Sequence, residues 1–259
     1  MININKNKNI GSVIYIVEGR EEEPRIIREF YKTFLGYNVY QLNREDDIEM
    51  LKKENNKYSK VIIVTINKPQ IKEIISDNID KFYQEVFINK LNGIVDTESS
   101  AIYYIFDRDD KSNTKEDIEK AMNKYNNSRE SSDYNSVHGL LLLSYPCIES
   151  LYLNCYKDKS SFSSSKEIKR YAREKRLKKL NDKSFENAIK EMDRIIKTKF
   201  DIQIFPSDLD AFEKVNIEIL DKEDKIYNYY HKYVTLSLFM ISLLDLEIIT
   251  FSKEKIIDY

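Results

Sequence analysis

The sequence predicts an α/β fold in which a parallel-rich sheet is flanked by helices and followed by a helical C-terminal region. Apolar runs of strand length alternate with helical patterns over residues 13–156, and several of these runs end in acidic or polar loops. Such alternation is typical of parallel α/β sheets. Beyond a Ser-rich connector near residue 158 the pattern is mainly helical. We therefore expect one domain over residues 1–157 and a helical region over residues 158–259.

The first predicted unit is a strand, a loop and a helix. The run Ser12–Val17 is β-branched and aromatic and stops at a Glu-Gly pair, as a buried strand does before a turn. Pro24 permits a helix to begin, because the first helical turn tolerates a residue without an N–H. Apolar residues then recur at helical spacing until Gly36, which ends the helix.

The rest of the domain continues this alternation. We expect a strand over 37–42, a short helix over 46–55, a strand over 60–66, a polar helix over 69–92, a strand over 100–106, a helix over 115–125, a surface loop over 126–136, a strand over 137–143 and a helix over 147–156. The run 100–106 is apolar on both faces and predicts a central strand. Ligands of open parallel sheets bind outside the carboxyl ends of the strands, so we expect the loops there to form the site.

Bulk composition indicates a globular protein of the reducing cytoplasm. The net charge of −2 gives no global attraction to a polyanion, so a nucleic-acid surface would need local segregation of charge. Cys147 and Cys155 fit neither a disulfide framework nor a zinc pattern and are expected in the core. No run of signal-peptide length follows the N-terminus. The apolar segment 233–249 is broken by polar residues, which predicts a buried helix and no contact with a membrane.

Asp107 and Asp109 form an acidic pair at the end of the predicted central strand. Alternate side chains of an extended chain point to the same side, so the two carboxylates should lie side by side on one side of the strand. A cation would relieve their repulsion, and Mg²⁺ or Mn²⁺ suits such oxygen ligands. Glu18, at the end of another strand, would complete a site able to polarise a phosphodiester. The alternative is that these are ordinary acidic residues at strand ends.

The order of these motifs resembles the TOPRIM fold shared by topoisomerases, primases and several nucleases, which has a Glu after its first strand and Asp-x-Asp after a later one. The segment 17–24, VEGREEEP, resembles the EGxxTEP start of RloB-like proteins, and 144–152, SYPCIESLY, resembles their SNPCFExW segment. Glu22 stands where Thr is expected and Tyr145 replaces Asn. The resemblance spans residues 13–156.

The resemblance implies a TOPRIM-like Rossmannoid catalytic domain that uses Mg²⁺ or Mn²⁺. Glu18 would act as general base or metal ligand, and Asp107 and Asp109 would hold the ion. Glu149 matches the Glu of the third motif, which belongs to a second-metal cluster in OLD-type nucleases. Glu22 and Glu23 compete for one ligand role, since OLD-type spacing favours the first and RloB-type spacing the second.

A basic segment after the boundary is the candidate nucleic-acid surface. It carries Lys169, Arg170, Arg173 and Arg176 with few acidic residues between them. Clustered Lys and Arg supply affinity for phosphates that does not depend on sequence. The alternative is a solvated helix face without a ligand.

These expectations favour a metal-dependent nuclease acting on DNA or RNA, with tRNA among the candidate substrates. The resemblance also implies a toxic effector of an antiphage, abortive-infection system. The alternative is a partner-binding regulatory module that works with a separate ATPase sensor. In that case the late apolar helix would be the surface on which the ATPase docks. The same helix is also a candidate contact between copies of the chain in a homo-oligomer. Primase or topoisomerase activity is less favoured, because the chain is short for those reactions.

Overall fold

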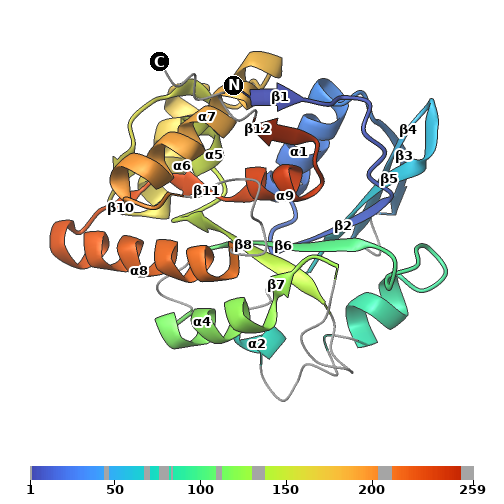
Figure 1. The fold of residues 1–259 in the computed structure, drawn as a ribbon, viewed down its shortest axis with the longest axis horizontal. Helices are drawn as coiled ribbons and strands as arrows, with labels where there is room; N and C mark the ends of the chain where they lie inside the picture. Colours follow the sequence, from blue (N-terminus) through green and yellow to red (C-terminus); the bar gives the residue numbers. More distant parts are fainter. Residues whose placement is uncertain are drawn as a thin grey trace, which may run out of the picture.

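The structure is a computed structural model of the 259-residue chain. It describes residues 2–43, 47–66, 71–75, 82, 84–108, 113–129, 138–203 and 212–251. Within these residues the chain is an α/β protein with a mixed, mostly parallel central sheet covered by helices on both faces (Figure 1). The predicted fold class is confirmed at this level.

The described residues form a sheet of eight strands in the order β11-β8-β6-β2-β5-β4-β3, with β7 paired beside β8. Its strands are β2 (Ser12–Val17), β3 (Asn38–Asn43), β4 (Ile48–Lys53), β5 (Asn56–Thr65), β6 (Ala101–Asp107), β7 (Asn126–Asn127), β8 (Gly139–Tyr145) and β11 (Leu236–Ser237). The four central strands β8, β6, β2 and β5 are parallel to one another, whereas β4, β3, β7 and β11 pair antiparallel. Strands β2, β6 and β8 are apolar on both faces because helices cover both sides.

Residues 48–53 form a strand, and the predicted short helix over 46–55 is wrong. Ile48 and Leu51 are three residues apart, which also fits a helix, but both are buried where β4 pairs with β5. Ile48 lies opposite Val64, and Lys53 lies opposite Asn56, which leaves a two-residue turn between the strands. Residues 48–53 form a strand because they pair in a hairpin with the long strand β5, and the preference of a segment for β structure depends on such pairing.

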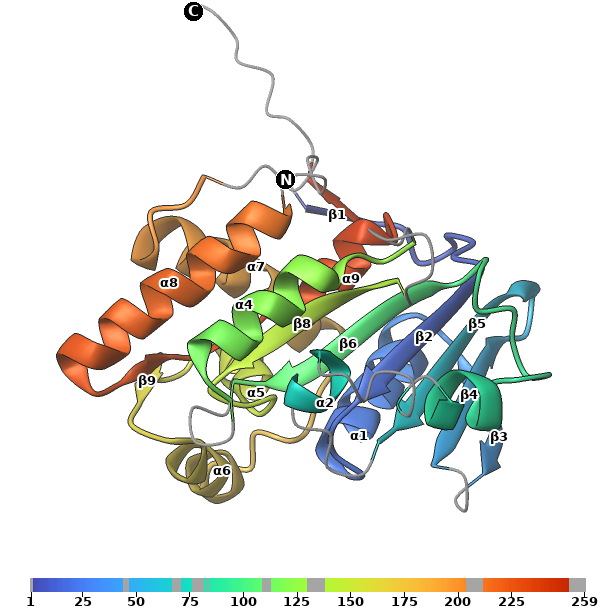
Figure 2. The ribbon, with the colours of Figure 1, turned by 90° about the horizontal axis from the view of Figure 1, so that it is seen from below.

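Helices cover the two faces of the sheet as separate groups (Figure 2). One face carries α1 (Glu22–Glu29), the π-helical turn η1 (Phe30–Phe34), α5 (Ser150–Tyr156), α7 (Asp182–Lys199) and α9 (Phe239–Asp245). The other carries α2 (Ile71–Ile75), α4 (Lys115–Lys124) and α8 (Phe212–Tyr230). The predicted helices at 24–36 and 115–125 are confirmed, and the one at 147–156 begins at Ser150. Of the predicted helix over 69–92, the described parts include α2 and η2 (Gln84–Lys90).

The C-terminal region is mainly helical, as expected, and is tied to the sheet. Besides α6 (Ser165–Glu174) it contains β9 (Ser161–Phe162), β10 (Tyr233–Val234) and β12 (Ile249–Phe251). Strand β11 extends the central sheet next to β8, β12 pairs with β1 (Ile2–Ile4), and α7 packs on α5. The boundary at residue 158 remains a prediction, but the two parts share one hydrophobic core.

The late apolar segment is buried within the chain. It forms β10, β11 and α9 in place of the single predicted helix, and Leu236, Phe239 and Leu243 are fully buried. The expected use of this segment as a docking surface for a homo-oligomer or an ATPase is therefore wrong, because the sheet and α7 already cover it. None of the helices that the structure describes is both long and apolar enough to cross a membrane.

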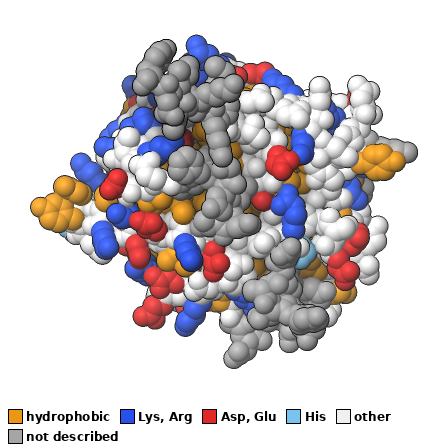
Figure 3. Space-filling view, in the orientation of Figure 1, with side chains coloured by type: hydrophobic (Ala, Val, Ile, Leu, Met, Phe, Trp, Pro, Cys, Tyr) orange, Lys and Arg blue, Asp and Glu red, His pale blue; other side chains and the backbone are white. Residues whose placement is uncertain are grey.

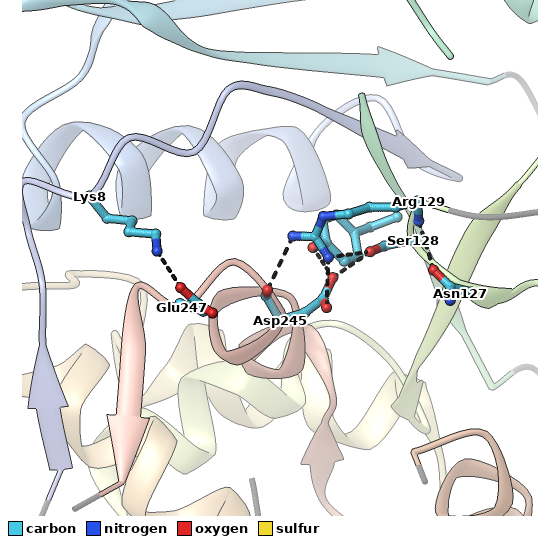
Figure 4. A network of polar contacts seen from close by, with 7 residues as sticks. Lys8, Asn127, Ser128, Arg129, Asp245 and Glu247 are labelled. Atoms are coloured by element: carbon cyan, nitrogen blue, oxygen red, sulfur yellow. Dashed lines mark hydrogen bonds and ion pairs between the residues drawn. The ribbon is translucent and has the colours of Figure 1, made fainter. Parts of the chain in front are cut away.

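A polar network fastens α9 to the sheet (Figure 4). The carboxylate of Asp245 accepts hydrogen bonds from the hydroxyls of Tyr103 and Ser128 and pairs with Arg129 Nη1 at 3.0 Å. Close by, Lys8 pairs with Glu247, whose side chain is largely exposed. Asp245 therefore links α9 to β6 and to the segment after β7.

We expect Asp245→Asn to lower the free energy of unfolding by about 2 kcal/mol, because hydrogen bonds to a charged group contribute about 1.5–3 kcal/mol each. Glu247→Gln, which removes an exposed charge from the same network, should change it by less than about 0.5 kcal/mol. Urea unfolding monitored by circular dichroism compares the two variants. Equal losses would contradict the fastening role of Asp245.

Candidate active site

Four acidic side chains gather at the carboxyl edge of the parallel strands. Asp107 is the last residue of β6, and Glu18 follows β2 directly. Glu149 precedes α5, shortly after β8, and Glu23 lies in the first turn of α1. Because β2, β6 and β8 are parallel neighbours, their ends bring these residues together.

Asp107 lies among like charges. Burial raises the pKa of its carboxyl group well above the usual value, and the negative charges of Glu23, Glu149 and Glu18 raise it further. Lys169 opposes this effect. The N–H of Ile148 donates to Asp107 Oδ1 at 2.7 Å and fixes the carboxylate beside the start of α5. Asp107 is therefore held in place where its charge is unfavourable.

Glu149 and Glu23 are the buried members of the cluster. Glu149 is 4% exposed, and its Oε2 atom is buried without a hydrogen-bond partner among the described residues. Its other oxygen lies 3.8 Å from Lys169 Nζ. Glu23 is 7% exposed, and burial together with the charge of Glu149 raises its pKa. A buried carboxylate oxygen without a partner is costly, and a bound cation would satisfy it.

Gly19 makes room for the Glu23 carboxylate. A Cβ atom on Gly19 would lie 2.3 Å from Glu23 Oε2 and 3.0 Å from its Cδ. Any larger residue would displace this carboxylate. Gly19 was expected to be a turn glycine, and its close approach to Glu23 gives it a second role in shaping the cluster.

Glu22 is engaged in ion pairs that stabilise the fold. Its carboxylate pairs with Arg25 and Lys178 and accepts a hydrogen bond from the Tyr152 hydroxyl at 3.1 Å. Burial alone would raise its pKa, but the hydrogen bonds from Lys178 and Arg25 lower it. Of the two residues that compete for one ligand role, Glu23 is the one beside Asp107 and Glu149.

Arg108 points away from the carboxylates. Its Nη2 atom lies 3.2 Å from Asp224 of α8, and its Nη1 donates to the carbonyl oxygen of Asn113 at 3.3 Å. This direction agrees with alternation along β6, which places Asp107 and Arg108 on opposite faces. Asp109 lies outside the described residues, so its position beside Asp107 remains a prediction.

Sequence reasoning missed two neighbours of the cluster. Cys147 is buried, as expected for a core residue, but its thiol lies beside Glu149 and Asp107, and burial with these charges raises its pKa well above the usual value. Lys169 was expected only as a nucleic-acid contact. Burial would lower its pKa, but the charges of Glu149 and Asp107 raise it. The packing of α6 against α5 brings Lys169 to the cluster, and the pairing of β6 with β8 brings Cys147 beside Asp107.

The basic face of α6 is open. Lys169, Arg170, Arg173 and Arg176 are exposed, and no ion pair with another described residue engages the three arginines. Lys169 pairs with Glu149 at the carboxylate cluster, and the three arginines face solvent with their charges available to a ligand.

The carboxylates fit a hard divalent cation in charge and donor type, since Mg²⁺ and Mn²⁺ prefer oxygen ligands and Glu149 offers a buried unpartnered one. Within the described residues, however, no group of three or more His, Cys, Asp or Glu side chains is already arranged to hold a metal ion. Asp107, Glu149 and Glu23 would be the ligands, and Asp109 is the expected further one.

No family model, curated protein or solved structure matches the chain. The functional interpretation therefore depends on the site itself and on the resemblance of the three motifs.

We expect Asp107→Asn to raise the melting temperature by a few degrees at pH 7–8 in EDTA. The folded-state pKa of Asp107 is raised, so its contribution to stability is greatest below the unfolded pKa of about 3.9 and is lost as the pH rises through the folded value. Glu22→Gln should have the opposite sign, because a lowered pKa stabilises the fold above the unfolded value. Melting curves between pH 3 and 8 test both signs. Destabilisation by Asp107→Asn at pH 8 would contradict the unfavourable placement of its charge.

Proposed function

We propose that this protein is a Mg²⁺- or Mn²⁺-dependent phosphodiesterase that hydrolyses nucleic acid and has a TOPRIM-like catalytic domain. The observation that carries the proposal is the convergence of Asp107, Glu149 and Glu23 from separate segments at the carboxyl edge of the sheet, with Lys169 beside them. Clusters that contain carboxyl groups with raised pKa values, as Asp107 and Glu23 have here, are typical of functional sites. The order of the motifs supports the same interpretation.

The chain's residues have distinct roles in this proposal. Asp107, Glu149 and Glu23 would hold the cation, which when bound would polarise the phosphodiester and lower the pKa of water. Lys169 lies at the open side of the cluster, where its ammonium group would contact a non-bridging phosphate oxygen. Hydrolysis forms a new P–O bond from water and breaks the bond to the leaving oxygen. Glu18 is the candidate base for the proton of the attacking water, and the leaving oxygen takes up a proton.

The substrate class follows from the charge around the site. The chain carries a net charge of −2, so the exposed cations of α6 are a local concentration of positive charge, and Lys169 among them lies beside the acidic cluster. Phosphate contacts of this kind do not distinguish DNA from RNA. DNA, RNA and tRNA therefore remain candidate substrates.

The biological role is proposed from the resemblance alone. Similarity to RloB-like and OLD-type proteins favours a toxic effector in antiphage defence, activated by a separate ATPase. The alternative of a partner-binding regulatory module is less favoured, because the apolar segment assigned to docking is buried within the chain.

The purified protein should cut labelled DNA or RNA in the presence of Mg²⁺ or Mn²⁺, and EDTA should stop the reaction. Asp107→Asn and Glu149→Gln should each reduce the rate by at least about 100-fold, which corresponds to about 3 kcal/mol of lost transition-state stabilisation. Glu218→Gln, an exposed acid-to-amide change on α8, is the matched control and should leave the rate unchanged. Equal cutting by all four proteins would contradict the proposed site.

Gly19→Ala should raise the metal concentration needed for half-maximal cutting, because a Cβ atom displaces the Glu23 carboxylate. The expected increase is about 10-fold or more, the scale of effects on metal affinity from residues that orient ligands. Glu21→Ala changes an exposed residue in the same turn and should have no such effect.

A double-mutant cycle separates this displacement from general damage. If Gly19 acts through Glu23, Gly19→Ala should lose little further activity in a Glu23→Gln background. Additive losses would show that the glycine matters for another reason.

A further inference from the structure

We propose that the protein binds a single-stranded segment of nucleic acid, whose phosphates follow the basic face of α6 and whose bases stack on tyrosines at the C-terminal end of α8. This inference rests on the proposed function and specifies its substrate. We name the stacking surface, formed by Tyr229, Tyr230 and His231, the aromatic tip.

The aromatic tip places two exposed rings next to each other. Tyr229 is 77% and Tyr230 is 64% accessible, and their ring centroids lie 4.6 Å apart in an edge-to-face arrangement. Hydrophobic side chains gather at this end of α8, at the left of the surface view (Figure 3). Single exposed rings are common, but neighbouring exposed rings offer a contiguous apolar surface of the kind that marks interaction sites.

The tip is held by the residues around it. The ring of Tyr227 stacks on buried Tyr233 with centroids 4.3 Å apart, and the His231 N–H donates to the Tyr227 carbonyl oxygen at 2.7 Å. Glu223 Oε2 accepts from the Val234 N–H at 3.2 Å and closes the turn. The two exposed rings therefore project from a fixed support, which lowers the entropic cost of stacking a base on them.

A continuous set of contacts joins the tip to α6. Strand β10 follows the tip and pairs with β9, where Tyr233 lies opposite Phe162. Strand β9 leads into α6, and Phe162 packs edge-to-face on Tyr171 of that helix at 5.2 Å. The β9–β10 pair therefore lies between the end of α8 and α6, which are separate in Figure 2. The aromatic tip, the arginines of α6 and Lys169 at the carboxylate cluster thus lie along one side of the molecule.

The chemistry of this surface favours unpaired bases. Exposed Arg170 and Arg173 offer charge to a phosphate backbone, and exposed Lys225 and Lys232 flank the tip. Proteins that bind single strands combine cations along the backbone with aromatic rings on which bases stack. In a duplex the base faces are covered by neighbouring pairs, so surface tyrosines cannot stack on them. The combination therefore distinguishes a single strand from a duplex, which the arginines alone would not.

Binding measured without cutting tests the inference. The Asp107→Asn protein is titrated against three fluorescent ligands in the same buffer: a single strand, its hairpin duplex, and a single strand of equal length without bases. The doubly substituted Tyr229→Ala/Tyr230→Ala variant should bind the single strand about 10-fold or more weaker, the scale of losing base–aromatic stacking. Its affinity for the duplex should not change. The base-free strand should bind the parent protein about as weakly as the variant binds the normal strand.

Two controls accompany the titration. Tyr40→Ala removes a tyrosine that is 65% exposed on β3, at the other edge of the sheet, and should leave all affinities unchanged. Arg170→Gln/Arg173→Gln should weaken single strand, base-free strand and duplex alike and reduce the salt dependence of binding. Melting curves check that each variant folds.

The outcomes separate this inference from the proposed function. If the tyrosine variant binds single strands as well as the parent does, or loses affinity equally for duplex, the stacking surface is wrong while the nuclease remains supported by its binding. If the parent binds none of the three ligands, the proposed function itself is contradicted. If sedimentation shows that the parent self-associates and the tyrosine variant does not, the tip is a contact between copies of the chain and the inference is overturned.

Discussion

The site depends on the parallel pairing of β2, β6 and β8. This pairing places the ends of three apolar strands at one edge of the sheet, where Asp107 ends β6, Glu18 follows β2, and Glu149 lies four residues past β8. Buried strands hold their ends rigidly, because both faces of the sheet are packed. The carboxylates of Asp107, Glu23 and Glu149 therefore lie close together although their charges repel one another.

This arrangement of carboxylates destabilises the folded chain and favours the binding of a cation. Burial and like charge raise the pKa values of Asp107 and Glu23, whereas Glu22, one residue away, is neutralised by Arg25 and Lys178. The same short segment thus contains one carboxylate that stabilises the fold, that of Glu22, and one that destabilises it, that of Glu23. Sites that bind or react with ligands commonly reduce stability in this way. The contrast is a stronger indication of function than the number of acidic residues.

The sequence predicted the parts of the fold that are encoded locally. Strands such as 12–17 and 101–107 are apolar on both faces, and their type follows from the run itself. The hairpin strand β4 was taken for a helix because its structure depends on pairing with β5. At the site, the choice between Glu22 and Glu23 could not be made from spacing, since the direction of each side chain depends on Arg25, Lys178 and Gly19. Spacing says nothing of Lys178, which is 156 residues away from Glu22 in the chain.

The C-terminal region completes the site as well as the core. Lys169 of α6 pairs with the buried Glu149 carboxylate, and Asp224 of α8 pairs with Arg108, the residue between Asp107 and Asp109. Removing either partner would leave a buried charge uncompensated, which is strongly destabilising. The segment that follows β6 is therefore stabilised by α8 through Asp224, and the carboxylate cluster is stabilised by α6 through Lys169. Because α6 and α8 also carry the proposed single-strand surface, substrate contacts and the support of the acidic residues come from the same two helices.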